Sequence, residues 1–134
     1  MELHERILKL LNSSTVFLIS TIDKRGFPSV IAVSAPLWRE GLLKFQFYLD
    51  GNGETAKNIQ LNPSGAICCY KEVEHESLLL KGKFSLQPIE STDKLEPRLS
   101  VYQKELAHPE PVLVIFETWT ARIHMDKKTK NIIA

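Results

Sequence analysis

Alternating apolar and polar residues divide much of the chain into short extended segments. In residues 42–49 (LLKFQFYL), polar side chains separate a series of apolar ones, namely Leu43, Phe45, Phe47 and Leu49. A period of two predicts a strand with one buried face. Residues 15–22 (TVFLISTI) are β-branched or apolar on both sides, which predicts a strand that is covered on both faces.

Four further segments have the composition of strands: 29–35, 64–71, 77–87 and 111–125. The last is long enough for one strand or for two that are separated by a bend. A turn from Asp23 to Pro28 should join the first two strands as a hairpin, with Gly26 free to adopt a positive φ. Gly82, in the middle of its segment, predicts a bulge or a bend of the sheet.

Helical patterns are short and few. Residues 2–11 carry an amphipathic pattern, and a short helix should follow the turn Asp50–Gly53 and end near Leu61. Residues 91–107 also look helical, although Pro97 should begin or break a turn. Six strands at hairpin-like spacing without a βαβ rhythm predict a mainly β (α+β) fold, an antiparallel, closed or nearly closed six-stranded barrel with short flanking helices. We expect one domain over residues 1–134.

The candidate core consists of large apolar residues on the predicted strands. We assign to it Phe17, Phe45, Phe47, Val114 and Phe116.

The charge balance limits the classes of partner. A net charge of +1 gives no reason to expect nucleic acid or an anionic membrane as a partner. The basic run Lys127, Lys128 and Lys130 is typical of a solvated tail. No apolar run reaches the roughly 18 residues of a membrane span, and the first residues do not resemble a signal peptide. We therefore expect a cytoplasmic protein.

The residues that most often carry catalysis or bind metals are scattered. Cys68 and Cys69 are adjacent in a predicted strand, so their side chains point to opposite faces and should remain free thiols. No metal site is expected, because no cysteine or histidine spacing suits one. We expect structural or exposed positions for the histidines His4, His75, His108 and His124. No catalytic residue can be named.

One stretch has the outline of an anion site. YLDGNGETAKNIQLNP (48–63) leaves a strand, crosses a glycine-rich turn and enters a short helix. Backbone N–H groups at such a helix start can bind phosphate, with Thr55 and Lys57 beside them. The alternative is a capped helix whose Thr55 and Lys57 only face water.

The order of several motifs resembles one known family. Thr21, Ile22, Asp23, Gly26 and Pro28 fit the pattern T-h-D-x-x-G-x-P, where h is apolar, and Asn58, Ile59, Asn62 and Pro63 fit N-I-x-x-N-P. With the strands between and after them, over residues 5–85, they resemble the pyridoxamine 5'-phosphate oxidase-like, FMN-binding split-barrel family, as a small member of the general stress protein type. The resemblance implies a six-stranded split barrel and a homodimer with FMN in a groove at the subunit interface.

The same resemblance implies a set of cofactor-binding positions. Residues beside the flavin ring would be Val30, Ala32, Val33 and Ser34. Positions near the ring and the ribityl chain would be Tyr48, Leu49 and Asp50, and phosphate ligands would be Thr55 and Lys57. Trp119 would border the partner subunit's pocket.

This sequence also departs from the family pattern. The oxidases proper have a Ser-Arg-Lys run in the phosphate loop, where this chain has Gly53-Glu54-Thr55, and the strand after Pro28 lacks an arginine. Arg25 and Lys81 are distant substitutes. Pyridoxamine phosphate oxidase activity is therefore not expected. Three hypotheses remain. The protein is a flavin-dependent oxidoreductase of unknown substrate, or it binds a deazaflavin or haem instead. The third is a non-catalytic dimeric ligand-binding or stress-associated module without flavin.

Overall fold

The fold is described by a computed structural model, which covers residues 2–133. Within this range one sheet contains eight strands. They are β1 (Val16–Ile22), β2 (Pro28–Ser34), β3 (Trp38–Glu40), β4 (Lys44–Asp50), β5 (Ser64–Lys71), β6 (Glu76–Pro88), β7 (Pro111–Met125) and β8 (Lys128–Ile133). The helices are α1 (Leu3–Ser13), α2 (Glu54–Leu61), α3 (Thr92–Leu95) and α4 (Val101–Leu106), with a 3₁₀ turn η1 (Glu96–Arg98) after α3.

The sheet is antiparallel and open. Its strand order is β2-β1-β5-β6-β7-β4-β3, and β8 pairs with β7 beside this path. Within residues 2–133, β2 pairs only with β1 and β3 only with β4, so no hydrogen-bonded ladder closes the barrel. The mainly β, α+β class is confirmed. The expected six strands are all present, but the prediction of six is wrong because there are eight.

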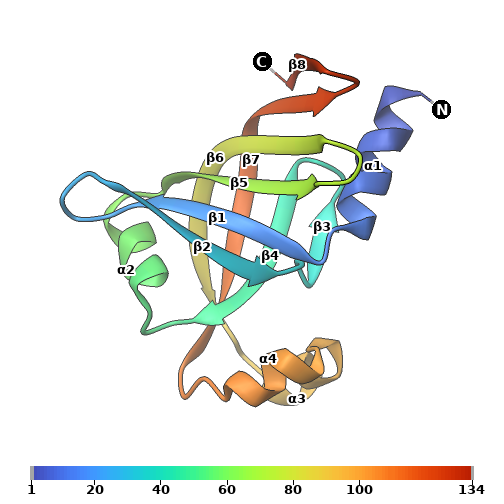
Figure 1. Ribbon diagram of the computed structural model, residues 1–134. Coiled ribbons are helices and arrows are strands. Elements are labelled where there is room, and N and C mark those ends of the chain that lie inside the picture. Colours follow the sequence, from blue (N-terminus) through green and yellow to red (C-terminus); the bar gives the residue numbers. More distant parts are fainter. Residues whose placement is uncertain (1, 134) are drawn as a thin grey trace.

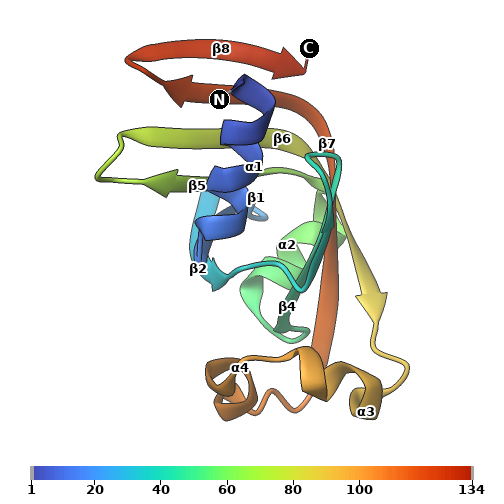
Figure 2. The ribbon, with the colours of Figure 1, turned by 90° about the vertical axis from the view of Figure 1, so that its right-hand side faces the viewer.

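The two additional strands are β3 and β8. β3 has only three residues, too few for a periodic pattern. β8 contains Lys128 and Lys130, which the sequence assigned to a solvated tail. Instead the chain reverses at Asp126 and Lys127, both with positive φ (55° and 63°), and β8 pairs back along β7. Figure 2 shows this hairpin at the top of the molecule, where β7 bends over.

Aromatic side chains from strands near the two ends of the sheet meet at the centre of the core. The rings of Phe17 and Phe47 meet edge to face, with centroids 5.8 Å apart, and Phe116 contacts Phe45 and Phe84 at 6.2 and 4.9 Å. All five predicted core residues are buried. The strand β1 buries only one face, because Leu18, Ser20 and Ile22 are half-exposed; the expectation of two covered faces is wrong for the single chain.

Gly82 lies at the predicted irregularity. The register between β6 and β7 shifts there: Lys81 pairs with Thr120, whereas Gly82 pairs with Thr118, so Trp119 is the extra residue of a bulge in β7. A Cβ on Gly82 would lie 1.9 Å from the carbonyl oxygen of Glu117. The bulge leaves Trp119 exposed, with the Lys83 ammonium 5.0 Å from its ring centroid.

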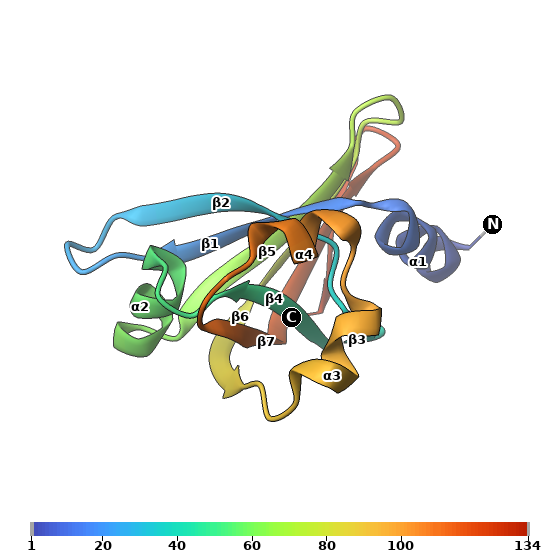
Figure 3. The same ribbon diagram turned by 90° about the horizontal axis from the view of Figure 1, so that it is seen from below.

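The helices cover different parts of the barrel. Figures 1 and 3 show α1 and α2 at opposite ends of the β1–β2 hairpin, with α3 and α4 together beyond the lower end of the sheet. α1 buries Ile7 and Leu10 against the core. Its Arg6 donates hydrogen bonds to Glu76 at 2.9 Å and to Asp126 at 2.6 Å, which ties the helix to the β6 and β7–β8 ends.

The two cysteines are free thiols, as predicted. Cys68 is half-buried and Cys69 is buried. Among residues 2–133, no helix combines the length and the apolar character needed to cross a membrane.

Candidate functional site

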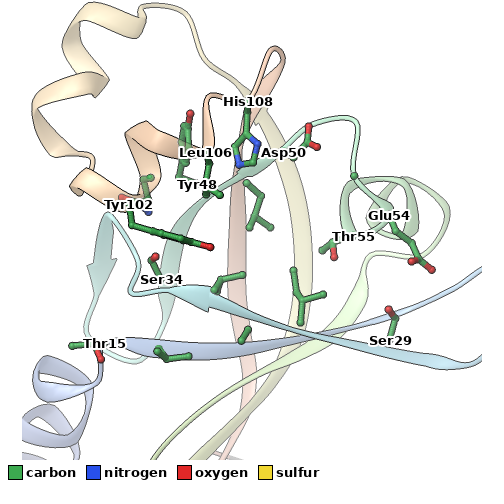
Figure 4. Close-up of a pocket in the computed structure, with 17 residues that line it drawn as sticks. Thr15, Ser29, Ser34, Tyr48, Asp50, Glu54, Thr55, Tyr102, Leu106 and His108 are labelled. Atoms are coloured by element: carbon green, nitrogen blue, oxygen red, sulfur yellow. The ribbon is translucent and has the colours of Figure 1, made fainter.

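A cavity of about 660 Å³ lies between β2, β4, the start of α2 and the segment of α4. Figure 4 shows Tyr102 and His108 at one side, Thr15 and Ser29 at the opposite side, and Thr55 at a third. The lining residues are Thr15, Val16, Ser29, Ile31, Ala32, Val33, Ser34, Tyr48, Leu49, Asp50, Gly53, Glu54, Thr55, Tyr102, Gln103, Leu106 and His108. The cavity therefore occupies the place where β2 and β4 do not pair.

The β2 side of the cavity has a free strand edge. β2 pairs with β1 along its full length from Pro28 to Ser34, but with no other strand of the described residues. An edge strand leaves backbone N–H and C=O groups unpaired on its outer side. Ile31 and Val33 add apolar surface beside these groups. A flat heteroaromatic ring with polar atoms along its edge would match this combination.

The turn between β4 and α2 forms the second wall. The Asp50 carboxylate accepts a hydrogen bond from the Asn52 N–H at 3.0 Å, and the Gly53 N–H donates to the Asp50 carbonyl at 3.2 Å. Gly53 is the N-cap of α2 and provides no side-chain cap. The first N–H groups of a helix have no intrahelical acceptor, so those of Glu54 and Thr55 remain available at this wall.

Two aromatic rings from distant parts of the chain meet at the third wall. The Tyr48 and His108 ring centroids are 5.7 Å apart, with an interplanar angle of 35°. Burial raises the pKa of the Tyr48 phenol. α4 begins with a capping box between Ser100 and Gln103, and this places Tyr102 over the cavity. The wall combines an imidazole with two phenols.

Seven of the ten sequence-predicted positions line this cavity: Ala32, Val33, Ser34, Tyr48, Leu49, Asp50 and Thr55. The other three, Val30, Lys57 and Trp119, are exposed and lie outside the lining. Lys57 is on the outer face of α2, because the buried residues of this helix are Thr55, Ala56, Asn58 and Ile59. A contact of Trp119 with a second subunit remains a prediction.

Sequence reasoning missed the contribution of α4 and of the loop after it. Tyr102, Gln103 and Leu106 belong to residues 91–107, which the sequence analysis described only as helical. His108 follows this segment and was expected to be structural or exposed. The Ser100–Gln103 capping box marks the start of α4 and could have been recognised in the sequence. Nothing in the sequence shows that this helix folds back over β4.

The motif residues that carry the family resemblance hold the walls in place. The buried Asn58 amide donates to the Thr21 hydroxyl at 3.1 Å, which joins α2 to β1. The Asp23 carboxylate accepts from the Arg25 and Phe27 N–H groups, both at 2.9 Å. The first pair joins α2 to β1 and Asp23 shapes the β1–β2 turn, and none of these residues lines the cavity.

The charge of the lining does not suit a phosphate. Among the lining residues, Asp50 and Glu54 carry carboxylates, and there is no lysine or arginine. Arg25 and Lys81, the distant substitutes, do not line the cavity either. Among residues 2–133, no cluster of three potential ligands could hold a metal ion. The lining therefore offers apolar surface and hydroxyl groups, but no basic side chain for an anion.

Comparison with known proteins finds matches among solved structures. No protein-family model matches the sequence, and no curated protein matches it. A protein from Clostridium acetobutylicum, related to general stress protein 26 of Bacillus subtilis and of the pyridoxinephosphate oxidase family, has a similar structure. Its TM-score is 0.79 at 16% identity, over 97% of this chain and 93% of that chain.

Two other similar structures have ligands in their names. A pyridoxamine 5'-phosphate oxidase-related, FMN binding protein from Nostoc punctiforme has a TM-score of 0.68 and 14% identity, over 97% of this chain and 94% of that one. A heme binding protein from Mycobacterium smegmatis has a TM-score of 0.74 and 11% identity, over 99% of this chain and 58% of that one.

An open antiparallel sheet with a cavity in its gap defines the class as a split barrel. Within that class, the chain has the fold of the pyridoxamine 5'-phosphate oxidase-like and general stress protein 26 proteins. The resemblance predicted from the sequence motifs is confirmed for the fold.

Proposed function

We propose that this protein binds a flavin such as FMN in the cavity and takes part in flavin-dependent oxidation or reduction of a substrate that is not yet known. The single observation that carries the proposal is the position of the cavity, between the free edge of β2 and the turn from β4 to α2. An FMN binding protein of the same fold supports it.

In this proposal the flavin itself supplies the transfer of electrons or hydride, and the protein supplies binding and orientation. The unpaired backbone groups of β2 would hydrogen-bond the ring edge, while Val33 and Leu49 exclude water from its face. The hydroxyls of Ser34 and Thr55 would bind the ribityl chain. We assign no general acid or base, and pyridoxamine phosphate oxidase activity is not part of the proposal.

A titration with free flavin tests the site. We expect purified protein to quench flavin fluorescence saturably, at one site per subunit. Ala32→Trp should fill part of the cavity and abolish this quenching, whereas Val73→Trp, in the exposed turn between β5 and β6 and outside the lining, should leave it unchanged. Equal quenching by both variants would place the flavin elsewhere, and absence of quenching by the unmodified protein would refute flavin binding.

A second pair of variants separates the two side chains that the sequence predicted as phosphate ligands. Thr55→Ala should weaken flavin binding, because Thr55 lines the cavity. Lys57→Ala should not, because Lys57 faces outward. A loss of affinity in Lys57→Ala alone would contradict the placement of the ligand described above.

Haem is the second candidate, and the observation that favours it is the imidazole of His108 in the cavity wall. Histidine is a common axial ligand of haem iron, and a heme binding protein shares the fold. A Soret band after incubation with haemin, lost in His108→Ala, would support haem. This candidate would be excluded if the unmodified protein gave no Soret band with haemin and His108→Ala bound flavin at full affinity.

We further propose that the working unit is a cytoplasmic homodimer, as the family resemblance implies. Val30 and Trp119 are apolar, large and exposed in the single chain, which supports a contact with a second copy. Light scattering coupled to gel filtration measures the mass directly, and a monomer would refute the dimer. A stable dimer that binds neither flavin nor haem would favour the non-catalytic ligand-binding or stress-associated module.

A further inference from the structure

The lining of the cavity includes two acidic residues and no lysine or arginine. A dianionic phosphate is usually held by the N-terminus of a helix and by basic side chains. Here the helix is α2, and the acidic residues Asp50 and Glu54 are among those that line the cavity beside it. No lysine or arginine is among the lining residues of the described chain.

The donors at this wall are partly used within the protein. Asp50 accepts the N–H groups of Asn52 and Gly53, through its carboxylate and its carbonyl respectively. Glu54 is in the first turn of α2, where a negative side chain is stabilised by the helix dipole. The position that would attract a phosphate therefore already has a carboxylate next to it.

Two lysines, Lys57 and Lys83, lie outside the lining of the cavity. Lys57 is exposed on the outer face of α2. Lys83 donates to the Ser64 hydroxyl at 2.7 Å and lies over the Trp119 ring. Neither is among the residues that line the cavity, so the lining itself contains Asp50 and Glu54 without a basic side chain.

The polar groups that do line the cavity are mostly neutral hydroxyls. They belong to Thr15, Ser29, Ser34, Tyr48, Thr55 and Tyr102. A hydroxyl both donates and accepts a hydrogen bond, so this set suits an uncharged polyol chain. It suits a dianion less well.

We propose that the cavity selects riboflavin, the flavin with an uncharged ribityl chain, over its phosphate ester FMN. This inference rests on the proposed flavin site and specifies its ligand. Because Glu54 is exposed and screened by water, the discrimination should be moderate, about tenfold in Kd at low ionic strength.

The test is a pair of fluorescence titrations, with riboflavin and with FMN, on the full chain at low and at high salt. Riboflavin should bind about tenfold more tightly than FMN at low salt, and the ratio should shrink as salt screens the carboxylates. Glu54→Gln should reduce the ratio severalfold. The matched control is Glu5→Gln, which removes a carboxylate from the first turn of α1, away from the cavity, and should not change the ratio.

The outcomes separate the inference from the function on which it rests. FMN binding as tightly as riboflavin, or more tightly, would overturn the inference but leave the proposed flavin site intact. A preference for riboflavin that ignores both salt and Glu54→Gln would also overturn it. Failure of both flavins to bind would refute the proposed function together with the inference.

Discussion

The Asn58 side-chain amide donates a hydrogen bond of 3.1 Å to the hydroxyl of Thr21, between α2 and β1. Both residues are buried, at 4% and 1% exposure. Each belongs to one of the two motifs that reveal the fold in the sequence, so the motifs are joined in space across 37 residues. The motif residues that led to the fold prediction thus form a buried contact between α2 and β1, and neither of them lines the cavity.

Removing the hydrogen bond between Asn58 and Thr21 should destabilise the protein. Asn58→Ala leaves the Thr21 hydroxyl buried without its partner, at a cost of about 1–3 kcal/mol in the free energy of unfolding. Urea denaturation measures it. In a double-mutant cycle with Thr21→Val, the double variant should lose less than the sum of the single variants. Additive losses would mean that the hydrogen bond contributes nothing specific.

Adding one methyl group at the β6–β7 bulge should be severe. In Gly82→Ala the new Cβ would lie 1.9 Å from the backbone oxygen of Glu117, so the strands must separate. We expect a loss of about 3 kcal/mol or more. Gly41→Ala is the comparison: its methyl group meets nothing within 4 Å, but its φ is +53°, which costs about 1–2 kcal/mol of backbone strain. Equal thermal stability of the two variants would contradict the bulge geometry.

The two thiols should react slowly in the folded protein. Burial raises the pKa of Cys69 to about 11, and burial also raises the pKa of Cys68. Since the thiolate is the reactive form, a colorimetric thiol reagent at pH 8 should modify Cys69 only after denaturant is added, when both thiols become available. In Cys69→Ala, only one thiol should be modified after denaturant is added. Rapid modification of two thiols in the unmodified protein without denaturant would show that the core opens easily.

The ion pairs that hold α1 should give a dependence on acid pH. A hydrogen bond from Arg6 lowers the pKa of the Asp126 carboxyl. A carboxyl whose pKa is lowered by folding contributes stability above its unfolded pKa, about 3.9, and loses this contribution as pH falls through the lower folded value. The difference in stability between the unmodified protein and Asp126→Asn should therefore be present at pH 7 and vanish in strong acid.

High salt is the control for this pair, because Asp126 is exposed and screening should reduce the same difference at pH 7. A difference that persists unchanged at low pH would show that Asp126 acts by packing or turn geometry and not by charge.

Sequence patterns predicted the parts of the fold that depend on local periodicity. Strands such as β4 and β7 were predictable because they alternate or are strongly apolar, and the irregularity at Gly82 was predictable because glycine tolerates close backbone approach. β3 was missed because three residues are too few to show a period. β8 was missed because Lys128 and Lys130 suggest a solvated tail, while its pairing depends on the turn at Asp126.

The candidate site was predictable on the two walls that are continuous with the motifs, around Ala32 and Thr55. The third wall required tertiary information, because His108 meets Tyr48 only after α4 folds back over β4. Lys57 lies outside the lining for a different reason: its direction depends on which face of α2 is buried. The helix period puts Lys57 opposite Asn58 and Ile59.

The position of β7 in the sheet has a consequence for synthesis. β7 pairs with β4, β6 and β8, so it lies between strands made long before it and one made just after it. The pairings of β7 with β4 and with β6 cannot form until residues 111–125 have left the ribosome. Contacts between positions far apart in the chain slow folding, so the protein should fold after translation of β7, and truncated nascent chains should need chaperones until then.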